Sequence, residues 1–132
     1  MKSISMDKSM MLIQKIVSII KEAKETLIVI DNYADITILD IISKINIPTT
    51  LITTKNNYLT KIDIEKYNEQ YNNLKIVYNN TFHDRYLILD NQIIYHMGAS
   101  INNAGSKTFS INILEDSIVI DAIIKKITSI HE

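Results

Sequence analysis

The sequence has no cysteine and no tryptophan, and it has only one proline and two glycines among its 132 residues. The absence of cysteine excludes disulfide bonds, thiolate catalysis and metal sites with cysteine ligands. The apolar runs are far shorter than the roughly 20 residues that a membrane-spanning helix needs. The start of the sequence lacks the uninterrupted hydrophobic stretch that would predict a signal peptide. We therefore expect a cytoplasmic protein that does not enter a membrane.

The sequence also lacks an excess of charge of either sign. Fourteen basic residues stand against fifteen acidic ones, so the formal net charge is −1 at pH 7. This balance does not indicate a general nucleic-acid binder, and any anion site must be local. Hydrophobic residues make up 46% of the chain and charged residues 22%, which is typical of a globular protein. The length predicts a single domain over residues 1–132.

The first 80 residues predict alternating helices and strands. An apolar stripe predicts a helix from about residue 7 to residue 24. Short apolar runs predict buried strands at Thr26–Asp31, Thr49–Thr54 and Leu74–Asn79. Between the strands we expect one helix capped by Asp35 and another over residues 62–71. Because crossover helices return the chain in the same direction, this half predicts a parallel α/β layer.

The rest of the chain predicts a hairpin, a further strand and a closing helix. The runs "RYLILD" and "IIYHM" are separated by almost nothing, and Asp90 and Asn91 are the expected turn residues. We expect the further strand over Lys107–Leu114. The closing helix is expected over Ser117–Ser129, with its inward side chains at Ile118, Ala122, Ile123 and Ile127. The predicted fold class is therefore α/β, with a mixed sheet flanked by helices.

The first hairpin strand carries the only arginine of the chain. His83 and Arg85 are two residues apart, so on a strand they point to the same face. If Asp90 and Asn91 are the central turn residues, Arg85 lies opposite His96; if the turn is one residue later, it lies opposite Gly98. Both registers place these residues and Ser100 on one face. The planar guanidinium fork matches two phosphate oxygens, so this face predicts an oxyanion site.

The same segment resembles the motif of the phospholipase D superfamily. His83, Arg85 and Asp90 follow the spacing H-x-R-x4-D, and Gly98, Ser100 and Asn102 follow as a Gly/Ser/Asn segment. The stretch "HDRYLILD…YHMGASINNAG" is similar to a small single-motif branch of bacterial and phage proteins in which arginine replaces the family lysine. The motif covers about 20 residues, and the element order agrees with the family over most of the chain. Compared with the usual pattern, the segment "GAS" contains one additional residue.

The resemblance implies a role for each motif residue. His83 would be the nucleophile that attacks phosphorus, and Arg85 would hold the non-bridging oxygens. Ser100 and Asn102 would donate hydrogen bonds to the phosphate or to His83. Asp90 completes the catalytic motif, although its place at the strand end favours bracing the turn over contacting substrate. No metal or other cofactor would be required.

Four further residues are candidates for substrate binding. Asn112 and Glu115 stand where small family nucleases have a downstream Asn/Glu pair, and Glu115 could orient the histidine ring. His96 could contact the bound anion or be a half-buried structural residue. Lys107 could extend the anion site, although a solvated lysine is the commoner case. His83, His96 and Asp90 do not have a spacing that suits a metal site.

The resemblance implies a metal-independent phosphodiesterase. Family enzymes use two motif copies, with one histidine attacking and the other protonating the leaving group. Because this chain has one copy, a homodimer with His83 from each subunit would follow. Nucleic acid is the favoured substrate. The alternative is an inactive module that binds nucleic acid or nucleotide, or that mediates dimerisation in a defence, regulatory or phage assembly.

Overall fold

The computed structural model describes residues 8–55, 57–101 and 107–131. Its helices and strands follow one another as α1 (Lys8–Ile20), β1 (Leu27–Ile30), α2 (Ile36–Ile42), β2 (Thr49–Thr53), α3 (Lys61–Gln70), β3 (Leu74–Tyr78), β4 (Arg85–Leu89), β5 (Ile93–Ile101), β6 (Lys107–Ile113) and α4 (Ser117–His131). The predicted order of elements is confirmed. No helix in the described ranges is long and apolar enough to cross a membrane.

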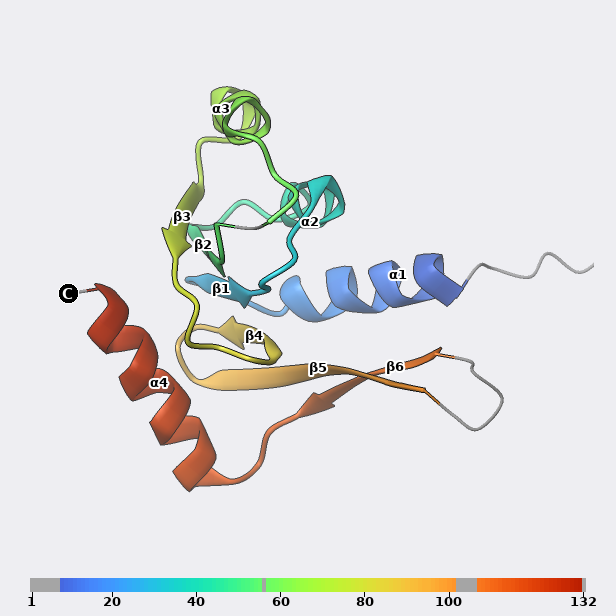
Figure 1. Ribbon diagram of the computed structural model, residues 1–132, viewed down its shortest axis with the longest axis vertical. Helices are drawn as coiled ribbons and strands as arrows, with labels where there is room; N and C mark the ends of the chain where they lie inside the picture. Colours follow the sequence, from blue (N-terminus) through green and yellow to red (C-terminus); the bar gives the residue numbers. More distant parts are fainter. Residues whose placement is uncertain (1–7, 56, 102–106, 132) are drawn as a thin grey trace, which may run out of the picture.

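The strands form one mixed sheet of six in the order β3-β2-β1-β4-β5-β6. Strands β1, β2 and β3 are parallel, while β4 runs antiparallel to β1, and β5 and β6 continue the antiparallel pattern. Figure 1 shows α1 and α2 on one side of this sheet and α4 on the other. The predicted α/β class with a mixed sheet flanked by helices is therefore confirmed.

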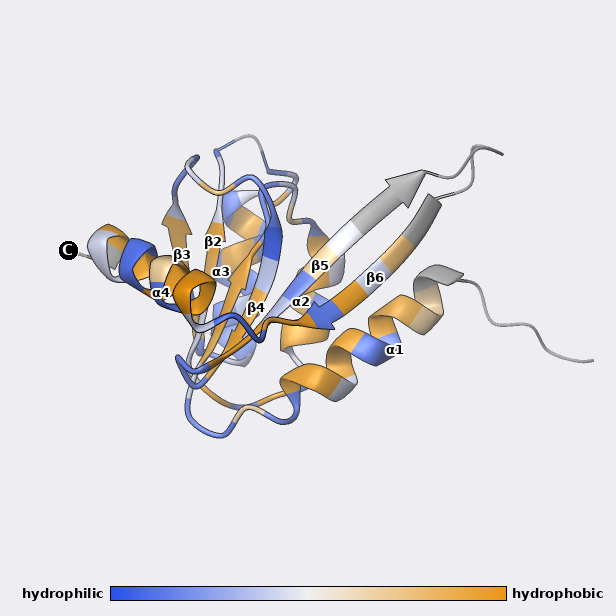
Figure 2. Ribbon diagram, turned by 90° about the horizontal axis from the view of Figure 1, so that it is seen from below, coloured by the Kyte–Doolittle hydropathy of each residue, from blue (hydrophilic) through white to orange (hydrophobic). Residues whose placement is uncertain are grey.

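Two hydrophobic clusters hold the helices to the two faces. On one face, side chains of α1 and α2 such as Ile20 and Ile42 pack with Leu27 and Leu87. On the other face, Ile123 and Ile127 of α4 pack against alternate residues of the same central strands. Figure 2 shows the hydrophobic colours along the central strands and the hydrophilic colours over the connecting loops. This alternation makes the sheet the centre of both cores.

Two of the four side chains of α4 that were predicted to face inward are exposed instead. Ile123 and Ile127 are buried as predicted, but Ile118 is 79% exposed and Ala122 is also exposed. Ile120 and Ile124 pack against the core instead. The cause is that α4 is rich in isoleucine on several sides, so periodicity alone did not decide which stripe faces the sheet.

The hairpin turn has the predicted centre but not the predicted register. Asp90 and Asn91 both have φ of 55°, and the Gln92 amide donates to the Leu89 carbonyl. However, Leu89 is paired with Ile93, so Gln92 is an additional residue in the turn. One additional residue reverses the facing of every later side chain on β5. Arg85 is therefore paired with Met97 rather than with His96 or Gly98.

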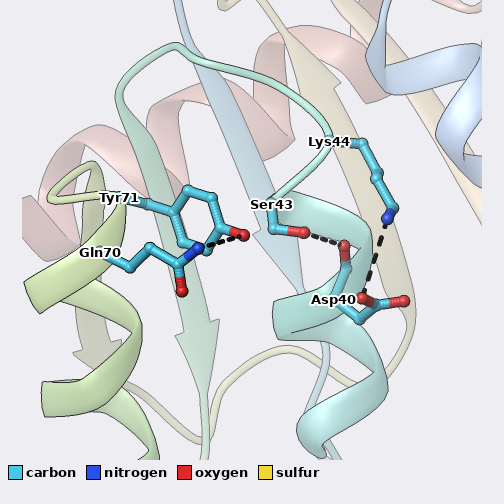
Figure 3. A network of polar contacts seen from close by, with 5 residues as sticks. All are labelled: Asp40, Ser43, Lys44, Gln70 and Tyr71. Atoms are coloured by element: carbon cyan, nitrogen blue, oxygen red, sulfur yellow. Dashed lines mark hydrogen bonds and ion pairs between the residues drawn. The ribbon is translucent and has the colours of Figure 1, made fainter.

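The sheet has two ends that differ in what lies there. We call the end with the β4–β5 turn the turn end, and the opposite one the carboxyl end, because β1, β2 and β3 finish there. Polar contacts at the last turns of α2 and α3, on the turn-end side, are local: Ser43 donates to the Asp40 carbonyl, Lys44 lies 3.9 Å from the Asp40 carboxylate, and Gln70 donates to Tyr71 (Figure 3). Such exposed contacts contribute little stability.

Candidate functional site

The carboxyl end of the sheet carries two residues of the motif, His83 and Arg85. Strands β1, β2 and β3 end there at Ile30, Thr53 and Tyr78, and β4 begins there at Arg85. Ligands of open α/β sheets bind outside the carboxyl ends of the parallel strands, where the strand order reverses direction. In this sheet the chain changes from parallel to antiparallel between β1 and β4. We therefore take this end as the candidate site.

The loop before His83 is fixed by contacts of its neighbours. The Asn32 side-chain amide donates to the Phe82 carbonyl at 2.7 Å, and the Phe82 ring is 3% exposed. Lys126 donates to the Thr81 carbonyl at 2.6 Å, and its ammonium lies 4.5 Å from the centre of the Phe82 ring. The backbone just before His83 is thus held by Asn32, which follows β1, and by Lys126 of α4. His83 itself is exposed and makes no hydrogen bond or ion pair with another described residue.

Arg85 lies at the first position of β4, half-buried on the face that α1 and α2 cover. Its side chain lines a cleft of about 410 Å³ between these helices and the sheet. Among the described residues, none accepts a hydrogen bond from the guanidinium or lies within ion-pair distance of it. The only arginine of the chain therefore lines the cleft without a structural partner among the described residues.

Asp31 lies in the same cleft, at the end of β1. Burial raises the pKa of this carboxyl, while the Tyr33 amide that donates to it at 2.9 Å and the nearby charge of Arg85 act in the lowering direction. The charge of Asp35 adds a further raising contribution. Asp35 caps α2 as predicted, by accepting from the Thr37 amide. The cleft thus contains one guanidinium and two carboxyl groups.

His96 lies on the opposite face of the sheet from Arg85. The prediction that the two share a face was wrong, because Gln92 shifts the register by one residue. His96 is instead paired with Tyr86; their rings are 5.4 Å apart, and the His96 Nε2 lies 3.7 Å from the Asp84 carboxylate. Burial raises the pKa of Tyr86, and the Asp84 charge beside it acts in the same direction. His96 belongs to this second cluster.

The shift of register in the hairpin also changes the face of the sheet to which Gly98 belongs. A Cβ at Gly98 would lie 3.4 Å from the Ser110 hydroxyl and 3.4 Å from the His96 ring. Gly98 therefore lies beside His96 and Ser110 and not beside Arg85. Ser100 is paired with Thr108 and Lys107 with Ile101, while Asn102 lies outside the described residues.

Three other predicted residues lie away from His83. The Asp90 carboxylate accepts hydrogen bonds from the backbone amides of Lys24, Glu25 and Thr26, which lowers its pKa. β4 is five residues long, so Asp90 is separated from Arg85 by about 16 Å of strand. Asn112 is exposed and paired with His96. Glu115 follows β6 on the side of the turn end, because Ile113 is already paired with Tyr95.

Asp31, Tyr33 and Asp84 were not among the candidate residues of the motif. The first two follow β1, at the position where α/β proteins place ligand clefts, so the predicted order of elements is the signal that could have identified them. Asp84 stands between the two motif residues and faces the other way. Among the described residues, no three histidine or acidic side chains gather closely enough to hold a metal ion.

Comparison with known proteins gives a fold relationship alone. No protein-family model matches the chain, and no curated protein matches it. Among solved structures, it is similar to TrmBL2, described as an archaeal chromatin protein that shows a novel mode of DNA binding, with a TM-score of 0.54 and 17% identity. The similarity covers 88% of this chain but 46% of TrmBL2, so the chain spans less than half of that protein. At this identity, the likeness supports the α/β architecture.

Proposed function

We propose that the chain is a phospholipase D-like domain that binds a phosphodiester at its carboxyl end and hydrolyses it without a metal ion. One observation carries the proposal: the guanidinium of Arg85 lacks a structural partner among the described residues and lies two residues after an exposed imidazole. An unpaired, half-buried guanidinium is costly unless a ligand anion satisfies its donors. The spacing of His83 and Arg85 matches the family motif.

In this mechanism His83 attacks phosphorus and forms a phosphohistidine as the bond from phosphorus to the leaving oxygen breaks. Arg85 offsets the charge that develops on the non-bridging oxygens. A second imidazole, in its protonated form, gives its proton to the leaving oxygen. Water then attacks the phosphohistidine and gives a proton to the second imidazole, which releases the phosphate monoester and restores both histidines.

The second imidazole has to come from another copy of the chain. His96 lies across the sheet from Arg85 and beside Asp84. His131 ends α4, whose packing is on that same far face. A two-fold homodimer that brings two exposed His83 side chains together would complete the site.

Nucleic acid is the phosphodiester that we favour. The structural relative TrmBL2 is described as binding DNA, and an exposed imidazole can approach the backbone of a polymer at any internal position. A net charge of −1 places the whole attraction for phosphate in the local site, so binding should be weak and should fall with salt only as steeply as a few phosphate contacts require.

A specific observation favours a second candidate, a module that binds phosphate without turning it over. No described carboxylate or amide orients the His83 ring, because Asp90 and Glu115 both lie toward the turn end. A nucleophilic histidine usually needs a partner that fixes its tautomer. Binding by Arg85 would remain in such a module, whereas turnover would not.

Turnover in the presence of EDTA separates the two candidates. Purified protein is incubated with single-stranded and double-stranded DNA, RNA and bis(p-nitrophenyl) phosphate, beside the His83→Ala variant. The enzyme proposal predicts product from the wild type, none from the variant, and a phosphohistidine after acid quench. If the wild type yields no product from any substrate but still binds oligonucleotide, the enzyme proposal is wrong and the non-catalytic module is supported.

A mixing experiment tests the shared site. In an equimolar mixture of wild type and His83→Ala, random exchange leaves about a quarter of the dimers with two copies of His83. Activity should therefore fall to about a quarter of that of pure wild type at the same total protein concentration. Independent sites in each chain would leave about half. The second result would contradict the two-chain mechanism while leaving the phosphate site in place.

A further inference from the structure

We infer that the cleft beside Arg85 holds a nucleobase, and that Asp31 reads the N–H donors on the edge of that base. This inference rests on the proposed phosphate role of Arg85 and specifies the substrate further. It assigns the ligand to a class, a nucleotide unit whose base carries an exocyclic amino group and for which guanine is the best fit.

The size and walls of the cleft suit a flat, largely apolar ring. Its volume is about 410 Å³, within the range of small-molecule sites. One wall is apolar and comes from α1 and α2, with Ile13, Ile16 and Ile38 among its side chains. Met97 of β5 adds a polarizable thioether from the sheet. A phosphate ion alone would leave these surfaces unused.

The polar groups of the cleft point to a ligand with both acceptor and donor parts. Arg85 is its only described cation, and Asp31 and Asp35 are its acidic residues. A bare anion would be attracted by one group and repelled by two. A nucleotide resolves this conflict, because its phosphate meets Arg85 while the N–H groups of its base meet a carboxylate.

Asp31 is the carboxyl group placed to accept from the base. It is partly buried, lines the cleft just after β1 and has one described hydrogen bond, from the Tyr33 amide to Oδ1. No other described residue donates to this carboxylate, so its remaining lone pairs can accept hydrogen bonds from a ligand. Guanine offers two adjacent N–H groups on its Watson–Crick edge, which match two carboxylate oxygens; thymine and uracil offer one. Asp35 is already occupied as the cap of α2.

Tyr33 gives the cleft a stacking surface at its rim. Its side chain is 69% exposed, and it lines the cleft together with Asp31 and Arg85. An exposed aromatic ring beside a charged, apolar-walled cleft is typical of sites that bind single-stranded nucleic acid. A flipped or single-stranded base could stack there while its edge reaches Asp31.

The test measures the affinity of small probes by isothermal titration calorimetry at low salt. The probes are inorganic phosphate, ribose 5-phosphate, dTMP, dGMP and dihexanoyl phosphatidic acid. We expect dGMP to bind roughly tenfold or more tightly than dTMP, and dTMP to bind more tightly than ribose 5-phosphate. Asp31→Asn should remove the preference for dGMP over dTMP. Tyr33→Ala should weaken both nucleotides by about tenfold and leave ribose 5-phosphate unchanged.

Two matched controls keep the result specific. Asp40→Asn removes an exposed carboxylate from α2 outside the cleft, and Tyr71→Ala removes a tyrosine that is 38% exposed on the turn-end side; neither should change any affinity. Because the Tyr33 side chain is exposed, its removal cannot unfold the core.

The outcomes also separate this inference from the proposed function. If ribose 5-phosphate or dihexanoyl phosphatidic acid binds as tightly as dGMP, and Arg85→Ala weakens all probes, the phosphate site stands and the base cleft is wrong. If Arg85→Ala changes no affinity, or no probe binds, the phosphate site itself is wrong and the base cleft fails with it.

Discussion

The two ends of the sheet each carry an aspartate, and the two aspartates have opposite surroundings. At the turn end, the Asp90 carboxylate accepts from three backbone amides, which lowers its pKa. At the carboxyl end, burial raises the pKa of Asp31, and one backbone amide and the charge of Arg85 offset this only in part. The first environment satisfies a charge and the second leaves it short of partners.

On the proposed function, this difference separates an end that stabilises the fold from an end that binds a ligand. Asp90 joins the β4–β5 turn to the segment between α1 and β1, so it fixes two parts of the chain that are distant in sequence. Groups that are unsatisfied in the free protein, such as Arg85 and Asp31, gather at functional sites, because a ligand supplies the missing partners. The motif therefore divides between the ends: His83 and Arg85 at one and Asp90 at the other.

The largest expected effect is that of Arg85→Ala at the carboxyl end. The loss of its donors should cost roughly 2–4 kcal/mol of transition-state stabilisation, or about two to three orders of magnitude in kcat/KM. Arg85→Lys keeps the charge but loses the fork, and should fall between. The control Lys75→Ala removes an exposed cation at the other end of the sheet. Equal kinetics for Arg85→Ala and Lys75→Ala would show that the carboxyl end does not bind the phosphate.

The next effect in size is on stability, at the turn end. Asp90→Ala should lower the melting temperature, because it leaves three backbone amides without their acceptor and places alanine at a φ of 55°. Asp90→Asn keeps the tolerance for this φ and one acceptor oxygen, so its loss should be smaller. Circular dichroism melting curves give both values. An Asp90→Ala protein as stable as the wild type would show that the hydrogen bonds of Asp90 do not stabilise the fold.

A smaller effect distinguishes the two aspartates by the sign of their pH dependence. The pKa of Asp90 is lowered below 3.8, so its contribution is present above that pH and is lost as the pH falls through the folded-state pKa. The pKa of Asp31 is raised above 3.8, so its ionised form destabilises the fold at neutral pH, and the penalty disappears as the pH falls through its raised pKa. Asp31→Asn should therefore melt at or above the wild-type temperature near neutral pH. A clear destabilisation by Asp31→Asn at pH 7, as large as that by Asp90→Asn, would contradict the assigned signs.

The smallest effect is expected on the far face of the sheet. His96→Ala should leave the affinity for phosphate probes unchanged, because His96 faces Asp84 and Tyr86 rather than Arg85. The measurement is the same calorimetric titration that is used for Arg85→Ala. A loss comparable to that of Arg85→Ala would show that the two residues bind one ligand and that the register of the hairpin is different in solution.

Sequence patterns predicted the elements and the turn well, because apolar periodicity and left-handed turn residues are local signals. They predicted the facing of β5 incorrectly, since one additional residue at Gln92 reverses it and both Asp90–Asn91 and Asn91–Gln92 turns had suggested the other parity. The motif proposes His83 and Arg85 as site residues, and this stays a prediction. The meeting of Arg85 with Asp31 joins residues that are far apart in sequence, and no local pattern encodes it.

The most direct test of the difference between the two ends is a ¹⁵N-edited NMR titration of the protein with a short single-stranded DNA at low salt. The account predicts that amide shifts change at Asp31–Tyr33 and at His83–Arg85, and that those of Lys24–Thr26 and of Asp90–Gln92 stay in place. The Arg85→Ala protein should show no such changes at the same DNA concentration. Shifts centred on the turn end, or unchanged binding by Arg85→Ala, would contradict the claim that the carboxyl end is the phosphate site.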